Sequence, residues 1–89
     1  MDCWIGVTRH ADRTVVSLAG RLGAAQAPEL LAACLQAGRP LQLDLSELVS
    51  LDAAGVEAIL RLRAHGVTLV GVPGYIQLKL GLARWPGAE

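Results

Sequence analysis

The chain has 89 residues, of which 53% are hydrophobic and 18% are charged. This length fits one domain, residues 1–89, because a first core would leave too few residues to enclose a second. The apolar content excludes an intrinsically disordered chain, since enough surface can be buried to offset the ordering entropy. The formal net charge is zero and the basic residues are scattered, so the sequence gives no electrostatic footprint for nucleic acid. The same charge balance is compatible with a homodimer or simply with a well-filled core.

The two cysteines, Cys3 and Cys34, have no CxxC spacing, and the sequence begins without the basic and apolar regions of a secretory signal. We therefore expect a reduced, cytoplasmic protein. The longest apolar-leaning stretch, residues 22–35, is interrupted by polar residues and a proline. It falls short of the roughly 20 apolar residues that span a bilayer, so no membrane insertion is expected.

The first elements in chain order form a predicted hairpin. Residues 4–7 and 14–18 are rich in β-branched residues, the second run ends at Gly20, and residues 10–13 have the polarity of a turn. A helix is predicted next, because Pro28 suits a first helical turn and apolar residues then recur at helical spacing up to Cys34 and Leu35. Cys34 lies on this apolar stripe and is expected in the core.

The second half predicts a strand, a helix, a strand and a final helix. Residues 41–45 alternate leucines with Gln42 and Asp44, which is typical of a strand with one buried face. Residues 46–51 are predicted as the longest loop. Residues 53–65 carry an apolar stripe that includes Arg63, which predicts a helix. Residues 67–72 are β-branched, which predicts a strand. Residues 75–85 fit both a strand and a helix, of which we favour the helix.

The residues that carry chemistry are few. No GxSxG elbow, Gly-Lys-Ser/Thr phosphate loop or GxGxxG motif occurs. His10 lies in a predicted turn and His65 at a predicted helix end, so two histidines and two unpaired cysteines do not supply the converging ligands of a zinc site. We therefore expect no metal, no cofactor and no enzymatic activity.

The most informative segment is residues 43–56, where a half-buried strand leads to a helix. Asp52 is well placed as the N-cap of that helix, and its first turn is Ala53, Ala54 and Gly55. Such small residues leave the amides of a helix start open to an anion or to a partner's backbone. They equally permit tight packing inside the domain, which physical reasoning alone favours.

At this segment the sequence resembles the STAS family, which includes sulfate-transporter tails and bacterial anti-sigma-factor antagonists. Family members show a strand like Leu-Asp-Leu-Ser, then a hydrophobic spacer, and then Asp-Ser-Ser/Ala-Gly at the start of a helix. In this chain residues 16–22, 65–72 and 80–82 extend the similarity over nearly the whole length. The resemblance implies an α/β fold with a mixed sheet of about four strands and about three helices.

One position departs from the family pattern. In members that act in partner switching, a serine or threonine directly after the motif aspartate is phosphorylated, and the phosphate releases the partner. Here that residue is Ala53, which cannot accept a phosphate. Ser46 and Ser50 lie nearby, where a turn-capping role is the simpler expectation.

The resemblance implies a bacterial, non-enzymatic, protein-binding regulatory module that docks a cytoplasmic partner through residues 46–59, as in the partner switching that regulates transcription. The partner would be an anti-sigma factor or a kinase of ATPase fold. The alternative is an accessory subunit on the ATPase of a bacterial phospholipid-transport ABC complex. The site residues expected for either partner are Ser46, Ser50, Asp52, Ala53, Ala54, Gly55 and Val56.

Overall fold

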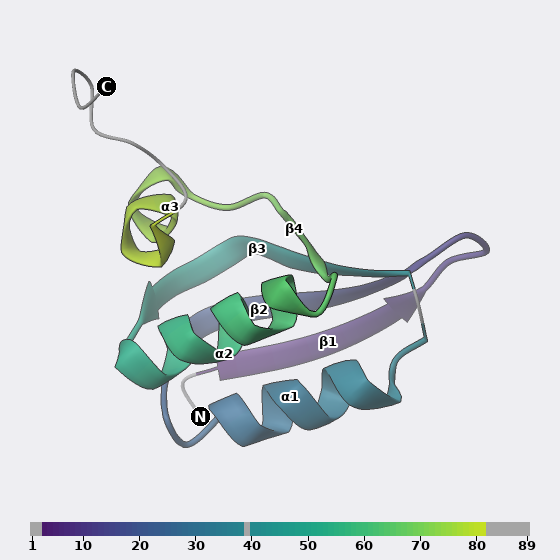
Figure 1. Ribbon diagram of the computed structural model, residues 1–89, viewed down its shortest axis with the longest axis horizontal. Helices are drawn as coiled ribbons and strands as arrows, with labels where there is room; N and C mark the ends of the chain where they lie inside the picture. Colours follow the sequence, from purple (N-terminus) through teal and green to yellow (C-terminus); the bar gives the residue numbers. More distant parts are fainter. Residues whose placement is uncertain (1–2, 39, 82–89) are drawn as a thin grey trace.

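The computed structural model describes residues 3–38 and 40–81, which form a four-stranded mixed sheet and three helices (Figure 1). The strands lie side by side in the order β1 (Cys3–Arg9), β2 (Thr14–Leu22), β3 (Leu41–Leu51) and β4 (Thr68–Val70). The helices are α1 (Ala27–Gln36), α2 (Ala53–Ala64) and α3 (Gly74–Leu80). β1 runs antiparallel to β2, whereas β2, β3 and β4 are parallel and are joined through α1 and α2. The α/β class expected from the sequence is confirmed.

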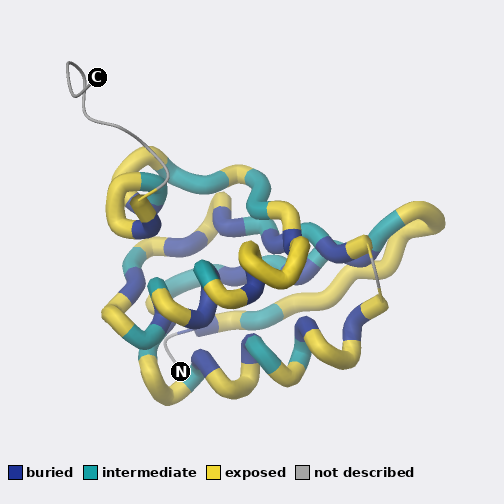
Figure 2. The backbone as a smooth tube through the Cα atoms, viewed as in Figure 1, coloured by how far each residue is buried: buried dark blue, intermediate teal, exposed yellow. Residues whose placement is uncertain are grey.

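The core lies between the sheet and the helices α1 and α2, which pack side by side on one face (Figures 1 and 2). Alternate residues of β2 and β3 point into it, because successive side chains of a strand face opposite sides of the sheet. Leu43 and Leu45 of β3 are fully buried against Leu30 of α1 and Ile59 of α2 in one cluster. Cys34 is buried there too, as expected.

β3 differs most from the sequence prediction. Residues 46–51, expected as a loop, continue the strand to Leu51. The pairing of β3 with β2 shifts register twice along this stretch, and each shift adds an unpaired residue to β3. The buried leucines therefore fall three residues apart, at Leu45, Leu48 and Leu51. A spacing of three breaks the strict alternation of residues 41–45, so the sequence did not show that the strand continues.

The helices are close to their predicted ranges. α2 ends near Gly66, whose positive φ of 92° gives the expected left-handed conformation. Arg63 was expected on the apolar stripe of α2 but is exposed. The buried residues of α2 are instead Gly55, Ala58, Ile59 and Leu62.

The C-terminal segment resolves the ambiguity of residues 75–85 in favour of a helix, because α3 is helical as far as Leu80. Residues 82–85 of that prediction lie outside the described residues. β4 is shorter than its predicted range of residues 67–72. Within residues 3–38 and 40–81, no helix combines the length and apolarity needed to cross a membrane.

Candidate partner-binding site

The carboxylate of Asp52 joins the start of α2 to the loop after β2. Its Oδ1 accepts a hydrogen bond from the Gly55 N–H at 2.9 Å, and its Oδ2 accepts one from the Ala24 N–H at 3.2 Å. The Gly55 bond is the main cause that lowers the pKa of Asp52, against a smaller opposing effect of desolvation and with further help from Ala24, Ala54 and Lys79. The N-cap role expected for Asp52 is confirmed, and both carboxylate oxygens already have partners.

Gly55 is small because the backbone of β2 lies against it. A Cβ atom at this position would sit 2.6 Å from the carbonyl oxygen of Leu22 and 3.2 Å from its Cγ. The Asp52 N–H donates to the same Leu22 carbonyl at 3.2 Å. Of the two interpretations of the small residues, tight packing therefore holds for Gly55. This glycine is buried and presents no surface to a partner.

Ala53 and Asp52 are the exposed residues of the helix start, while Ala54 and Val56 are half-buried. The Ala53 methyl group thus stands at the surface. Ser50 is half-buried and lines a shallow hollow of about 240 Å³ with Arg21 and Asp52.

Ser46 stands apart from the other expected site residues. It lies four residues before Ser50 on β3, which corresponds to about 13 Å along a strand. Its N–H donates to Asp44 Oδ1 at 2.9 Å, as in an Asx turn. A Cβ atom on Gly71 would lie 3.0 Å from Ser46 Cβ. Ser46 therefore lies beside Gly71, the residue after β4, rather than beside the start of α2.

α3 completes the site by holding the unpaired side of β3. β4 pairs with residues 42–44 of β3. Beyond residue 44, the side of β3 that faces away from β2 has no strand neighbour among the described residues. The Tyr75 hydroxyl donates to the carbonyls of Leu48 and Val49, and Lys79 Nζ donates to the carbonyl of Leu51 at 2.5 Å. These two side chains fix α3 beside the end of β3.

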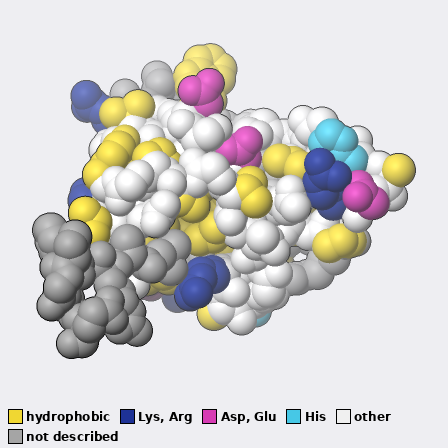
Figure 3. All heavy atoms as spheres, turned by 90° about the horizontal axis from the view of Figure 1, so that it is seen from above, with side chains coloured by type: hydrophobic (Ala, Val, Ile, Leu, Met, Phe, Trp, Pro, Cys, Tyr) yellow, Lys and Arg dark blue, Asp and Glu magenta, His cyan; other side chains and the backbone are white. Residues whose placement is uncertain are grey.

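The same contacts create an exposed apolar cluster that sequence reasoning missed. Val49 is 57% exposed, Tyr75 51% and Leu78 42%. Figure 3, seen from above, shows hydrophobic side chains gathered over the α3 end of the molecule with few charges between them. We call Val49, Asp52, Ala53, Tyr75 and Leu78 the docking surface. The sequence held one signal for it, the tyrosine and leucine three residues apart on the predicted last helix.

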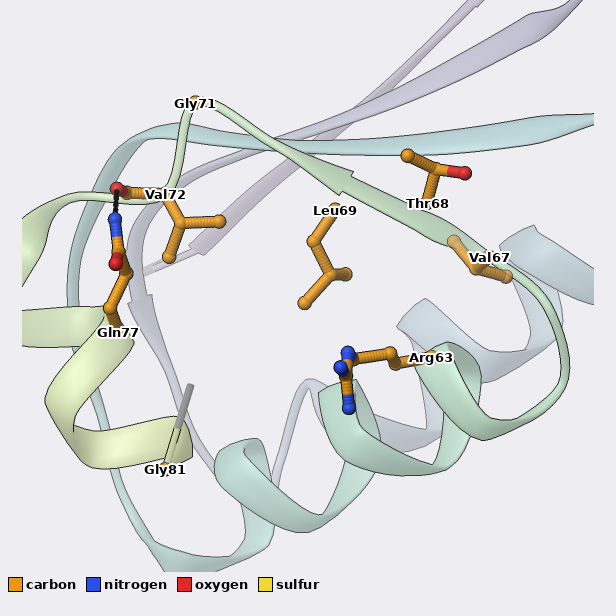
Figure 4. A pocket seen from close by; sticks show the side chains of 8 residues that line it. All are labelled: Arg63, Val67, Thr68, Leu69, Gly71, Val72, Gln77 and Gly81. Carbon is orange, nitrogen blue, oxygen red and sulfur yellow. Dashed lines mark hydrogen bonds between the residues drawn. The ribbon is translucent and has the colours of Figure 1, made fainter. Parts of the chain in front are cut away.

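A larger hollow lies elsewhere, between β4, α2 and α3 (Figure 4). It measures about 680 Å³ and is lined by Arg63, Leu69, Val72 and Gln77 among others. The Gln77 side chain is tied to the Val72 carbonyl at 3.0 Å, and the Arg63 guanidinium points into the opening. Its described lining contains no carboxylate, histidine or thiol, and none of the expected site residues.

The described cysteines and His65 show no sign of an activated nucleophile or a metal site. Burial raises the pKa of the Cys34 thiol, which disfavours the nucleophilic thiolate. His65 Nδ1 lies 2.8 Å from the Arg61 carbonyl at the end of α2. Among residues 3–38 and 40–81, no group of three potential metal ligands comes together.

The fold and this site define a small α/β module whose central strand leads directly into an aspartate-capped helix. A family model described as "Mlab, STAS domain" matches residues 5–82. The chain therefore belongs to the STAS domain family. No curated protein matches the sequence significantly.

Solved structures show the same fold. An antisigma-factor antagonist STAS domain from Rhodobacter sphaeroides is 22% identical with a TM-score of 0.59, and the match covers 79% of this chain and 87% of that one. An uncharacterised DUF3478-family protein with a SpoIIAA-like fold from Shewanella loihica PV-4 is 19% identical with a TM-score of 0.54, covering 88% and 73%. A protein named Mglu is 28% identical with a TM-score of 0.58, but the match spans only 18% of that chain and 72% of this one.

Proposed function

We propose that the protein is a non-enzymatic binding module that docks a cytoplasmic protein through residues 46–59, extended by Tyr75 and Leu78 of α3. The observation that carries this proposal is the exposed apolar cluster of Val49, Tyr75 and Leu78. Lys79 of α3 ties this cluster to the end of β3, immediately before the start of α2, through its bond to the Leu51 carbonyl. Apolar side chains flanked by polar ones at a fixed site are typical of protein interfaces. The hydrogen bonds of Tyr75 and Lys79 hold the cluster rigid, which lowers the entropic cost of binding.

The first candidate partner is an anti-sigma factor or a kinase of ATPase fold. In this setting Ala53 makes the interaction constitutive, because no phosphate of roughly −1.5 to −2 charge can be added at that side chain to displace the partner. The antisigma-factor antagonist STAS domain from Rhodobacter sphaeroides, which has the same fold, supports this class of partner.

The second candidate is an accessory subunit on the ATPase of a bacterial phospholipid-transport ABC complex. Ala53 favours this role too, since a permanent assembly needs no release switch. The same docking surface would then serve for assembly rather than for regulation.

Affinity capture from cells, followed by mass spectrometry, tests the proposal and separates the candidates. The first candidate predicts recovery of a histidine-kinase-like ATPase, and the second predicts a transporter ATPase together with its permease. The test variant is Ala53→Glu, which adds charge and bulk to the exposed first turn of α2, where an acidic group is compatible with the helix dipole.

Ala32→Glu is the matched control, because Ala32 is also an exposed helical alanine but lies on α1. The proposal predicts loss of the ATPase with Ala53→Glu and its retention with Ala32→Glu. Equal recovery with both variants would contradict it. Variants of Asp52 and Gly55 are unsuitable for this purpose, since both residues hold the fold together at the helix start.

A further inference from the structure

β1 leaves one edge of the sheet unpaired. Among the described strands only β2 pairs with it, and most of its length is exposed (Figure 2). Edge strands are commonly protected by prolines, charges or bulges. β1 contains no proline, its pairing with β2 shows no register shift, and its only charged residue is Arg9 at the end. The edge is therefore open to another strand.

Two hydrogen bonds show which backbone groups of β1 point outward. The His10 N–H donates to the Arg13 carbonyl at 2.8 Å, which makes these two residues a hydrogen-bonded pair. The Thr14 N–H instead donates to the Pro40 carbonyl at 2.9 Å, on the side away from β1. Bonded and non-bonded pairs alternate along an antiparallel ladder. The backbone groups that point outward therefore belong to Cys3, Ile5, Val7 and Arg9.

We propose that the protein forms a homodimer in which β1 pairs antiparallel with β1 of a second copy, with the two-fold axis at Gly6. In this register Ile5 faces Val7 of the second copy and Cys3 faces its Arg9. Every outward backbone group of the strand then exchanges hydrogen bonds. If the two β1 strands were shifted by one residue, the outward N–H and C=O groups of one strand would face groups of the other that are already bonded to β2. If they were shifted by two residues, the outward groups at one end of each strand would have no partner.

The side chains fit the same register on both faces of the sheet. Val7 is 47% exposed. It has Val16 of β2 on one side but no described strand neighbour on the other, where Ile5 of the second copy would supply one. On the other face Trp4 is 70% exposed and would lie opposite Thr8 of the second copy, diagonal to its Gly6. No atom lies within 4 Å of where a Gly6 Cβ would be, so the space above this glycine accepts an indole ring.

The charges at the ends of β1 are complementary across the axis. Burial raises the pKa of the Cys3 thiol, and the negative charge of Glu29 on α1 adds to this effect. Arg9 faces Cys3 of the second copy in the proposed register and so approaches that copy's Glu29, and the symmetry repeats the pair. Neither Arg9 nor Glu29 has an ion-pair partner among the described residues of its own chain. The formal net charge of zero adds no long-range repulsion.

The dimer edge is separate from the docking surface, since β2 lies between β1 and β3. Dimerisation and partner docking therefore fail or succeed independently.

Disulfide trapping tests the register. At the axis the two Gly6 Cα atoms would be about 4.5 Å apart, within the range that a disulfide bridges. In Gly6→Cys, oxidised glutathione should convert the two new thiols into an intermolecular disulfide while it is itself reduced, giving mainly dimer on a non-reducing gel. Thr8→Cys is the control, because its two thiols would lie about 13 Å apart along the strands. Equal cross-linking of both variants, or none of a folded Gly6→Cys, overturns the proposal.

Light scattering with size-exclusion chromatography tests the edge itself. The wild type should have about twice the 9.3 kDa chain mass. Val7→Pro removes an outward N–H without breaking a bond to β2 and should be monomeric, whereas Val7→Thr keeps the N–H and should remain dimeric. A monomeric wild type overturns the proposal, as does a dimer that persists in Val7→Pro. A wild type that stays monomeric but pairs this edge with a peptide strand would assign the edge to a different partner.

Discussion

Gly55→Ala tests the packing at the start of α2. The added Cβ would lie 2.6 Å from the Leu22 carbonyl oxygen, which is a backbone atom that cannot move without disturbing the end of β2. Overpacking of this kind costs about 1–3 kcal/mol, and the better helix propensity of alanine returns about 1 kcal/mol at most. We expect a net loss of up to about 2 kcal/mol in the free energy of unfolding, or up to about 16 °C in Tm for a chain of this size.

Gly74→Ala is the matched control, because Gly74 begins α3 and its would-be Cβ meets no atom within 4 Å outside its chain neighbours and its own helix. Its φ is not positive, so this variant should gain about 0.4–1 kcal/mol. Both variants are compared by urea denaturation followed by circular dichroism. If Gly55→Ala is as stable as Gly74→Ala, the close approach of α2 to Leu22 does not constrain this residue and the reasoning fails.

Three further predictions concern the elements around the site. The pKa of Asp52 is lowered from its ordinary value of 3.8, so the stability that its carboxylate contributes is complete well above pH 3.8 and is lost as pH falls through the folded-state pKa. In Asp52→Asn the free energy of unfolding should therefore fall less steeply with pH below 3.8. The same pH dependence in the variant and the wild type would argue against this cap. Tyr75→Phe removes the hydroxyl that donates to the Leu48 and Val49 carbonyls and should cost about 0.5–1.5 kcal/mol in urea unfolding, whereas no change would mean that α3 is held by other contacts. Leu30 has 0% exposure, so Leu30→Ala should lower the free energy of unfolding by about 2–5 kcal/mol. Leu35 is 84% exposed, so Leu35→Ala should change it by no more than about 0.5 kcal/mol. Similar losses in the two variants would refute the assignment of the buried and exposed faces of α1.

The sequence predicted the elements whose periodicity is regular. The alternation of residues 41–45 and the helical stripe before Cys34 both matched the structure, because a single buried face dictates them. Prediction ended where β3 gains two extra residues, since the leucines at 45, 48 and 51 are spaced by bulges whose existence depends on pairing with β2. Such pairing between distant segments leaves no local signal.

The candidate site was predicted in part for the same reason. Asp52 as N-cap follows from local rules, and the structure confirms it. The contribution of Tyr75 could not be read from the sequence, because its hydroxyl reaches β3 across 26 residues of chain. Gly55 was ambiguous until its distance to Leu22 was known. The short-range chemistry of the helix start was thus predictable, and the surface around it was not.

The central claim, that a protein partner docks at the helix start, is tested most directly by the dissociation constant of the captured ATPase. Isothermal titration calorimetry on purified components should show binding by the wild type, a similar constant for Ala32→Glu, and a constant weaker by at least about tenfold for Ala53→Glu, equivalent to about 1.4 kcal/mol. Equal constants for all three proteins, with Ala53→Glu folded, would contradict the account.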